Sequence, residues 1–363
     1  MSELAGNRSA GPGETLLQVC DLAVTFPSAD GAVRAVRGVD YTLRRGEVLG
    51  IVGESGSGKS VTSMAVMGLL PNTARITGSV MFDGRDLLTL SEQQLNTVRG
   101  NRIAMIFQDP MTSLNPVYTI GAQIAEAVRA HRDVGKAQAL ERAVELLRTV
   151  RIPNPEQQAG SYPHQLSGGM RQRVVIAIAM ANDPDVIIAD EPTTALDVTV
   201  QAQVLEALQA AQAETGAAMV LITHDLGVIA GQADRVMVMY AGKLVEVGSV
   251  EDIFYTPAMP YTLGLLGSLP RLDQQLERLT PIPGSPPSVV NMPPGCPFSP
   301  RCPLSTAVCD ETEPGLEPIG DDHRAACHHS SKVSGVRPDE MFDASGVDTE
   351  ALGEFVDAAE GRS

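Results

Sequence analysis

Short runs of apolar residues predict β-strands along much of the chain. Residues 16–26 and 32–43 alternate apolar and polar positions as strands do, with a turn at 28–31 between them. Residues 186–191 are apolar up to two terminal carboxylates, which is typical of a parallel strand covered on both faces. Further strands are expected over 47–52, 78–83, 101–107, 218–223, 235–240 and 243–247.

Apolar residues also recur at helical spacing, most clearly over 120–132 and 136–150. These stretches follow a loop over 109–116 that two prolines bracket, and they predict a mainly helical subdomain. The alternation of strands and helices indicates an α/β fold with a mixed or parallel sheet at its core. Further helices are expected over 61–70, 92–98, 173–181, 200–213 and 226–231.

The composition changes after about residue 252. Prolines crowd residues 257–303, and four of the five cysteines fall within 296–327. The last 33 residues hold eight acidic and three basic side chains, a balance typical of disorder. The predicted division is a disordered leader (1–13), a large domain (14–255) with the helical subdomain at about 90–170, a small cysteine-containing C-terminal domain (256–330) and an acidic disordered tail (331–363).

Charge and hydropathy exclude several classes of protein. The net charge of −17 and the lack of a long basic run argue against a nucleic-acid partner. The longest apolar run, residues 174–181, is too short to cross a bilayer. The N-terminal residues are small and polar and lack the apolar centre of a signal peptide. We therefore expect the chain in the cytosol, where any membrane contact goes through a partner protein.

Residues 53–60 read Gly-Glu-Ser-Gly-Ser-Gly-Lys-Ser, which matches the phosphate-binding P-loop. The motif lies between a predicted strand and a predicted helix, as its function requires. Its glycines allow backbone N–H groups to form an anion nest, while Lys59 reaches the β- and γ-phosphates and Ser60 coordinates Mg²⁺. The candidate nucleotide-binding residues are Gly53, Glu54, Ser55, Gly56, Ser57, Gly58, Lys59, Ser60 and Val61.

Four polar residues follow predicted strands, at the sheet edge where open α/β folds bind ligands. Asp190 is placed to hold Mg²⁺, directly or through water, and Glu191 is the candidate base for the attacking water. Adjacent carboxylates on a strand point to opposite sides, so we expect the two to have separate roles. His224 is expected to sense or stabilise the γ-phosphate, and Gln108 to reach Mg²⁺ and the water.

Two further features are expected near a nucleotide. Residues 166–172, the signature segment, read LSGGMRQ, and Gly168 and Gly169 start a predicted helix whose unpaired N–H groups suit an anion. Phe26, which ends a predicted strand, is a candidate for stacking on an adenine ring. A core or edge aromatic is the alternative for Phe26.

The P-loop, the signature segment, Asp190-Glu191, residues 195–197 and His224 occur in the order and spacing found in the ATP-binding subunit of an ABC transporter. The resemblance covers about residues 16–250, and the LSGGMRQR-type run is its most specific part. It implies the ABC ATPase fold and two subunits that dimerise head to tail. ATP on one P-loop is then capped by the partner's signature segment, with Asp197 at the interface. The signature residues so implicated are Ser167, Gly168, Gly169 and Gln172.

Residues 108–116, 191–199 and 257–270 resemble the dipeptide and oligopeptide importer ATPases. This resemblance implies ATP hydrolysis that powers peptide import, at the cytoplasmic face of the cell membrane. The implied partners are two transmembrane permease subunits, a second and related ATPase subunit, and indirectly an extracytoplasmic solute-binding protein. Met259 departs from the family, which usually has His there, but it lies outside the ATPase core.

Four cysteines form a second candidate metal site, because structural disulfides are rare in the cytosol. Their spacing lacks the close pairs typical of zinc sites, and four thiolates are able to hold a [4Fe–4S] cluster. The family resemblance implies the same cluster. Zinc, with help from His323, His328 or His329, and free thiols are the alternatives, while Cys20 is expected to be a buried small apolar residue. The four cysteines are Cys296, Cys302, Cys309 and Cys327.

Other functions remain as alternatives to peptide import. An ABC ATPase of DNA maintenance would carry a long coiled coil between P-loop and signature segment, but the roughly 110 residues there show no sustained heptads. A translation-associated ABC protein would carry each motif twice, and here each occurs once. An importer subunit for nickel or another small solute, and a redox-responsive ABC ATPase outside transport, stay open. Activity compared across redox states distinguishes the last of these.

Overall fold

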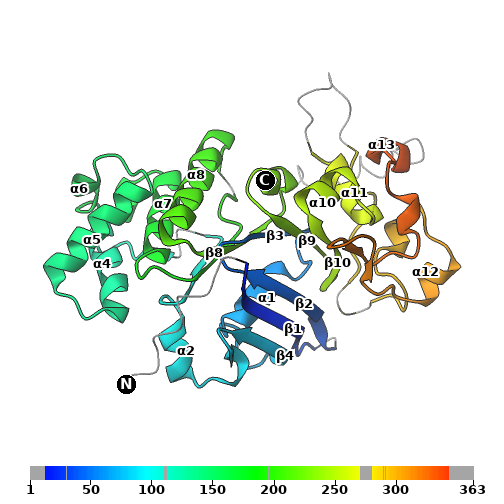
Figure 1. Cartoon of the computed structure of the whole chain (residues 1–363), viewed down its shortest axis with the longest axis horizontal. Helices are drawn as coiled ribbons and strands as arrows, with labels where there is room; N and C mark the ends of the chain where they lie inside the picture. The colour runs from blue at the N-terminus through cyan, green and yellow to red at the C-terminus, as the bar shows by residue number, and fades with distance from the viewer. Residues whose placement is uncertain are drawn as a thin grey trace, which may run out of the picture.

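The computed structural model describes residues 13–29, 31–109, 113–194, 196–269, 280–288, 290 and 292–342. The strands in this part of the chain are β1 Thr15–Phe26, β2 Val33–Arg44, β3 Val48–Val52, β4 Arg75–Phe82, β5 Arg85–Asp86, β6 Ile103–Ile106, β7 Val186–Asp190, β8 Ala218–Thr223, β9 Arg235–Tyr240, β10 Lys243–Ser249, β11 Glu317–Pro318 and β12 Arg324–Ala325. They form two sheets, one with the order β11-β12-β10-β9-β3-β8-β7-β6 and the other with the order β2-β1-β4-β5 (Figure 1).

The helices gather at two sides of the molecule, with α4 to α8 on one side and α10 to α13 on the other (Figure 1). The predictions of helices over 120–132 and 136–150 are confirmed by α4 and α5. The bounds of the helices are α1 Lys59–Val66, α2 Glu92–Val98, α4 Ile120–His131, α5 Lys136–Thr149, α6 Pro155–Gln158, α7 Gly168–Ala179, α8 Val198–Thr215, α9 Leu226–Ala230, α10 Val250–Tyr255, α11 Pro260–Gly267, α12 Ala307–Glu311 and α13 Pro338–Met341.

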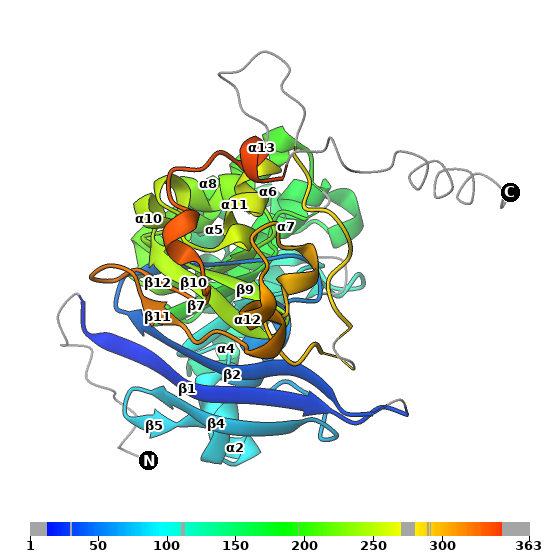
Figure 2. The same ribbon diagram turned by 90° about the vertical axis from the view of Figure 1, so that its right-hand side faces the viewer.

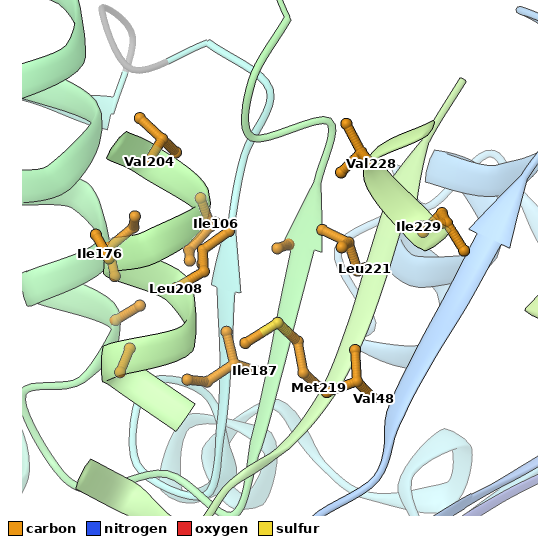
Figure 3. Packing of buried hydrophobic residues seen from close by; sticks show 14 of the residues in the cluster. Val48, Ile106, Ile176, Ile187, Val204, Leu208, Met219, Leu221, Val228 and Ile229 are labelled. Carbon is orange, nitrogen blue, oxygen red and sulfur yellow. The ribbon is translucent and has the colours of Figure 1, made fainter. Parts of the chain in front are cut away.

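The centre of the large sheet is parallel, through the neighbouring strands β9, β3, β8, β7 and β6. Successive residues of β7 enter different hydrophobic clusters, Ile187 on one face and Ile188 on the other. Ile187 and Met219 lie against Ile176 of α7 and Leu208 of α8 (Figure 3). The sheet is therefore covered on both faces, and because β10, β12 and β11 add antiparallel pairs, the predicted α/β fold with a mixed sheet is confirmed.

The small antiparallel sheet lies below the C-terminal elements in the view of Figure 2. Its strands β1, β2 and β4 share a hydrophobic cluster with α1 and with one face of the large sheet. Cys20 lies in β1 as predicted, but it is half-buried rather than buried. No helix of the described residues is both long and apolar enough to cross a membrane.

The C-terminal residues share the hydrophobic core of the rest of the chain. β12 pairs with β10 and so lengthens the large sheet, and Phe298 is completely buried. The prediction of a disordered tail is wrong for residues 331–342, because Val333, Met341 and Phe342 are buried in the same cluster. Apolar side chains at these positions outweigh the acidic composition that suggested disorder. Residues 343–363 and the predicted leader up to residue 12 lie outside the described residues.

A buried carboxylate joins the C-terminal residues to β10. Glu246 is 0% exposed and accepts hydrogen bonds from the backbone N–H groups of Ala258, at 2.6 Å, and Met259, at 3.2 Å. His323, just before β12, completes the arrangement with its Nε2 2.8 Å from Glu246 Oε1. The hydrogen bond to Glu246 raises the pKa of His323, although burial opposes the rise, and the charge of Asp252 adds to it. Protonated His323 therefore stabilises the docked C-terminal residues.

We expect this stabilisation to be lost at alkaline pH. Because the folded pKa of His323 lies above its ordinary value of 6.5, its contribution is fully present below that value and disappears as the pH rises through the folded pKa. The melting temperature of the wild type should exceed that of His323→Gln most at about pH 6 and least at about pH 9. A difference that is constant or grows with pH would show that the pair does not titrate this way.

Candidate functional site

The P-loop connects β3 to α1 at the carboxyl end of the parallel strands. Gly53 has φ +154° and lies so close to β9 that a Cβ atom there would overlap the carbonyl oxygen of Met239. The Lys59 ammonium donates to the carbonyls of Gly53 and Glu54 at 2.7 and 3.0 Å, so the side chain folds back onto the start of the loop. The structure thus provides the phosphate cradle that the sequence predicts, at the N-terminus of a helix.

Two of the three residues expected at Mg²⁺, Ser60 and Asp190, meet directly, whereas Gln108 contacts Glu191. The Ser60 hydroxyl donates to Asp190 Oδ1 at 2.9 Å, although 130 residues separate them in the chain. Burial raises the pKa of Asp190, although the hydrogen bond from Ser60 opposes this rise. Burial lowers the pKa of Lys59, although the negative charges of Glu191 and Asp190 oppose this fall. One hydroxyl and one carboxylate beside a phosphate cradle are ligands that suit Mg²⁺.

Glu191 lies at the centre of a group of polar side chains at the strand ends. Its Oε2 accepts hydrogen bonds from Gln108 Nε2 at 3.1 Å and Thr194 Oγ1 at 2.8 Å, and lies 3.4 Å from His224 Nδ1. The structure therefore brings together three candidates that sequence reasoning drew from separate strands, and adds Thr194. Glu191 has already left β7, with φ +46°, so its direction follows from a left-handed turn rather than from strand alternation.

An open pocket of about 980 Å³ lies in front of these groups. Its lining includes the P-loop, Gln108, Glu191 and His224, and Phe26 also reaches it, as the proposed contact with a base requires. Leu265, Ser268, Pro281 and Ile282, which sequence analysis did not single out, complete the wall. The four come from α11 and the segment after it, so residues beyond the P-loop region help to shape the site.

The signature segment does not line this pocket. Ser167 is exposed at the N-cap of α7, where its Oγ accepts a hydrogen bond from the N–H of Met170 at 3.3 Å. Gln172 is only 1% exposed, and neither atom of its amide has a hydrogen-bond partner in the described part of the chain. Its burial speaks against the predicted contact of Gln172 with a nucleotide, whereas Ser167 and Gly168 are open to a neighbouring molecule.

Gly169 also has a packing role. A Cβ atom at this position would overlap Cγ1 of Val200 on α8, whereas the nearest atom to a Cβ at Gly168 is Leu196 Cδ2 at 3.8 Å. We expect Gly169→Ala to lower the free energy of unfolding by about 1–3 kcal/mol, because the added methyl group would push α7 away from α8. Gly168→Ala is the matched control, and its free energy of unfolding should fall less. Chemical denaturation of both variants measures this, and equal losses would contradict it.

A contact from the far end of the chain reaches the P-loop. Arg301 forms an ion pair with Glu54, with its terminal nitrogens 2.6 and 2.9 Å from the two carboxylate oxygens. The N–H of Glu54 donates to the hydroxyl of Tyr261 at 2.7 Å. Sequence reasoning missed both contacts. No local pattern could have revealed a pair 247 residues apart.

The four C-terminal cysteines are free; Cys309 is buried, and the other three are half-buried. The N–H of Cys296 donates to the carbonyl of Cys309 at 2.7 Å. Burial raises the pKa of Cys302 to about 12 and that of Cys327 to about 11, and the neighbouring cysteines of the group add to both shifts. The raised pKa values mean that these thiols stay protonated unless a positive charge or a metal lowers their pKa.

The described residues include no group of three or more His, Cys, Asp or Glu side chains placed to hold a single metal ion. The histidines that kept zinc open have other partners. His323 contacts Glu246, His328 Nε2 lies 2.9 Å from the carbonyl of Thr312, and His329 Nε2 lies 2.8 Å from Thr306 Oγ1. A zinc site with histidine ligands is therefore not supported.

Two family models match the chain. The model described as "ABC transporter" matches residues 36–194. The model described as "Oligopeptide/dipeptide transporter, C-terminal region" matches residues 245–309. The two matches cover the P-loop, the signature segment and three of the four C-terminal cysteines.

Curated relatives and solved structures agree with these models. The "Oligopeptide transport ATP-binding protein OppD" of Mycobacterium tuberculosis is 56% identical over 322 residues, 88% of this chain and 53% of that protein, so the chain spans about half its length. The "Dipeptide transport ATP-binding protein DppD" of Bacillus subtilis is 52% identical over 316 residues, 86% of this chain and 94% of that protein. A dimeric ATP-binding cassette, MJ0796, in a post-hydrolysis state with ADP and Pi, aligns with a TM-score of 0.58 at 27% identity, covering 65% of this chain and 99% of that one.

Proposed function

The chain belongs to the ATP-binding subunits of oligopeptide and dipeptide ABC transporters, and we propose from this premise that it hydrolyses ATP to power the import of peptides. The observation that carries the proposal is the hydrogen bond between Ser60 and Asp190, next to the P-loop and to the polar side chains around Glu191. This arrangement holds each part that phosphoryl transfer to water requires.

Each residue of the site then has one task. The P-loop N–H groups and Lys59 bind the β- and γ-phosphates, while Ser60 and Asp190, with Gln108 as a further candidate, would hold Mg²⁺. When bound, Mg²⁺ would neutralise negative charge on the phosphate oxygens. Glu191 accepts the proton of the attacking water, and Gln108 and His224 fix the direction of its carboxylate. Phe26 is the candidate contact to the adenine.

The remaining partners follow from the exposed signature segment and from the relatives. A second ATPase subunit places its Ser167 counterpart on the nucleotide of this chain, while Ser167 and Gly168 serve the partner's nucleotide and Asp197 lies at the interface. Two permease subunits and, indirectly, an extracytoplasmic solute-binding protein complete the transporter. We place the chain at the cytoplasmic face of the membrane, bound through the permeases.

Reconstitution tests the proposal. This chain, with the permeases and binding protein that co-purify with it, is placed in vesicles, and uptake of labelled peptides is measured with MgATP. Uptake that needs ATP and fails with Lys59→Ala is expected. Uptake of a nickel complex but of no peptide would replace the proposed substrate, and no ATP hydrolysis at all would overturn the proposed function.

We also propose that Cys296, Cys302, Cys309 and Cys327 hold a [4Fe–4S] cluster. Support comes from the backbone hydrogen bond between Cys296 and Cys309 and from the burial that raises the pKa of Cys302 and of Cys327. When bound, the cluster would tie α12 and the turn after Cys296 to β12, which is a structural task.

Anaerobic purification tests the cluster. We expect brown protein with iron and sulfide in a ratio near one, and with broad absorbance near about 400 nm. Substitution of any one of the four cysteines by Ser should remove the colour, whereas Cys20→Ser, as the control, should keep it. Stoichiometric zinc without iron, or four reactive thiols without metal, would contradict the proposal.

A further inference from the structure

Arg301 is held from several sides while it pairs with the P-loop. Besides its two bonds to Glu54, its Nε donates to the carbonyl of Pro283 at 2.9 Å, and a terminal nitrogen lies 3.2 Å from the Tyr240 hydroxyl. The guanidinium stacks over the rings of Tyr240 and Phe298, with Cζ 5.9 and 5.7 Å from their centroids. Its planar fork is thus fixed in the orientation that a bidentate carboxylate requires.

Arg301 is removed from water in this ion pair, and Glu54 is partly so. The Arg301 side chain is 4% exposed and that of Glu54 is 27% exposed. Burial alone would lower the pKa of Arg301, but its hydrogen bonds to Glu54 and Tyr240 raise it. Loss of one partner of such a pair leaves the other charge uncompensated, which is more costly than the loss of a surface pair.

The uncompensated charge would lie in the phosphate cradle itself. The carbonyl of Glu54 accepts from Lys59 at 3.0 Å, and the carboxylate of Glu54 acts on the charge of Lys59. A free carboxylate here would repel a triphosphate and compete for Lys59. We propose that Arg301 is a positioning residue for nucleotide binding, which neutralises Glu54 and holds its carboxylate away from the phosphates. This inference rests on the proposed ATP site and assigns a new residue to it.

The position of Arg301 in the chain adds a second consequence. It ends the 3₁₀ turn Ser299–Arg301, which lies between Cys296 and Cys302. The N–H of Ser299 donates to the carbonyl of Cys296 at 3.0 Å, and the N–H of Cys302 donates to that of Ser299 at 3.1 Å. The turn and the P-loop are therefore coupled through one side chain. Because coupling between sites is reciprocal, nucleotide binding must stabilise the turn as much as the turn favours nucleotide binding.

Three variants of the full chain test the assignment, with affinity for a fluorescent ATP analogue and Mg²⁺ as the readout. Arg301→Ala should weaken binding by about 5- to 150-fold, the usual range of such couplings. Glu54→Gln combined with Arg301→Ala should regain most of the lost affinity, because no carboxylate is then left unpaired in the phosphate cradle. Arg148→Ala, which removes an exposed pair with Glu156, is the control and should have no effect.

The double variant separates positioning from a general loss of structure. If it binds as poorly as Arg301→Ala, or if Arg301→Ala binds as well as the wild type, the inference is wrong. Failure of the wild type to bind the analogue would instead refute the proposed function.

A measurement on the wild type keeps the inference testable if Arg301→Ala does not fold. Hydrogen exchange of the amides of residues 296–302 should slow when MgATP is added, and should not slow in Lys59→Ala. Arg301→Lys, which keeps the charge but not the bidentate geometry, should show a smaller effect of nucleotide. Exchange that is unaffected by nucleotide in the wild type would overturn the coupling.

Discussion

Glu191→Gln is expected to lower ATP turnover by about 10²–10⁴-fold while ATP binding is retained. Glutamine preserves the shape of the side chain and its hydrogen bonds, but the amide cannot accept a proton from water. The loss of turnover should be specific to this residue, because Gln108, Thr194 and His224 all orient the carboxylate of Glu191. The phosphate cradle and the Ser60–Asp190 pair are untouched, so the affinity for MgATP should change little.

The measurement combines steady-state phosphate release with titration of a fluorescent ATP analogue. Glu206→Gln is a suitable control, because it removes a carboxylate on α8 that pairs only with Arg151 at the surface. Its turnover should equal that of the wild type. Near-normal hydrolysis by Glu191→Gln would remove Glu191 from the role of base, and a large loss of ATP affinity would mean that the residue binds nucleotide instead.

Sequence reasoning identified the groups whose placement depends on short segments. The P-loop and Glu191 each follow a buried strand, Asp190 ends one, and parallel strands bring their carboxyl ends to one edge of the sheet. Periodicity likewise located α4, α5 and the hairpin of β9 and β10, because each buries one face or both. These predictions needed only local pattern and the rule that open α/β sheets bind ligands at one edge.

The features that sequence reasoning missed depend mainly on contacts between segments far apart in the chain. Nothing in residues 296–302 indicates that Arg301 will meet Glu54, because a single arginine among prolines has no periodicity to interpret. The tail was misjudged for a related reason, since its few apolar residues, such as Val333 and Phe342, are buried only through a cluster that they share with distant elements such as α11. The direction of Glu191 was also beyond prediction, because one left-handed residue ends the strand alternation.

Ser167→Asp is expected to abolish association of the ATPase subunits while each subunit still binds ATP. Ser167 caps α7 and lies outside the pocket of its own chain, so its task in a head-to-tail dimer is at the partner's γ-phosphate. Aspartate is as good an N-cap as serine, so α7 should stay intact. Its charge, however, would face the triphosphate of the partner, and like charges brought together at an interface cost several kcal/mol.

Light scattering with the Glu191→Gln chain measures this directly, because slow hydrolysis should preserve the ATP-bound dimer. Addition of MgATP should produce dimers, with a second copy or with the co-purified ATPase subunit, whereas the same chain with Ser167→Asp should remain monomeric. The dimerisation constant should fall by at least about 10²-fold, since each 1.4 kcal/mol is a factor of ten. Ser167→Asn keeps the cap without the charge and should dimerise far better than Ser167→Asp. If Ser167→Asp instead weakens ATP binding by the monomer, the signature segment acts on its own nucleotide, and the head-to-tail arrangement is wrong.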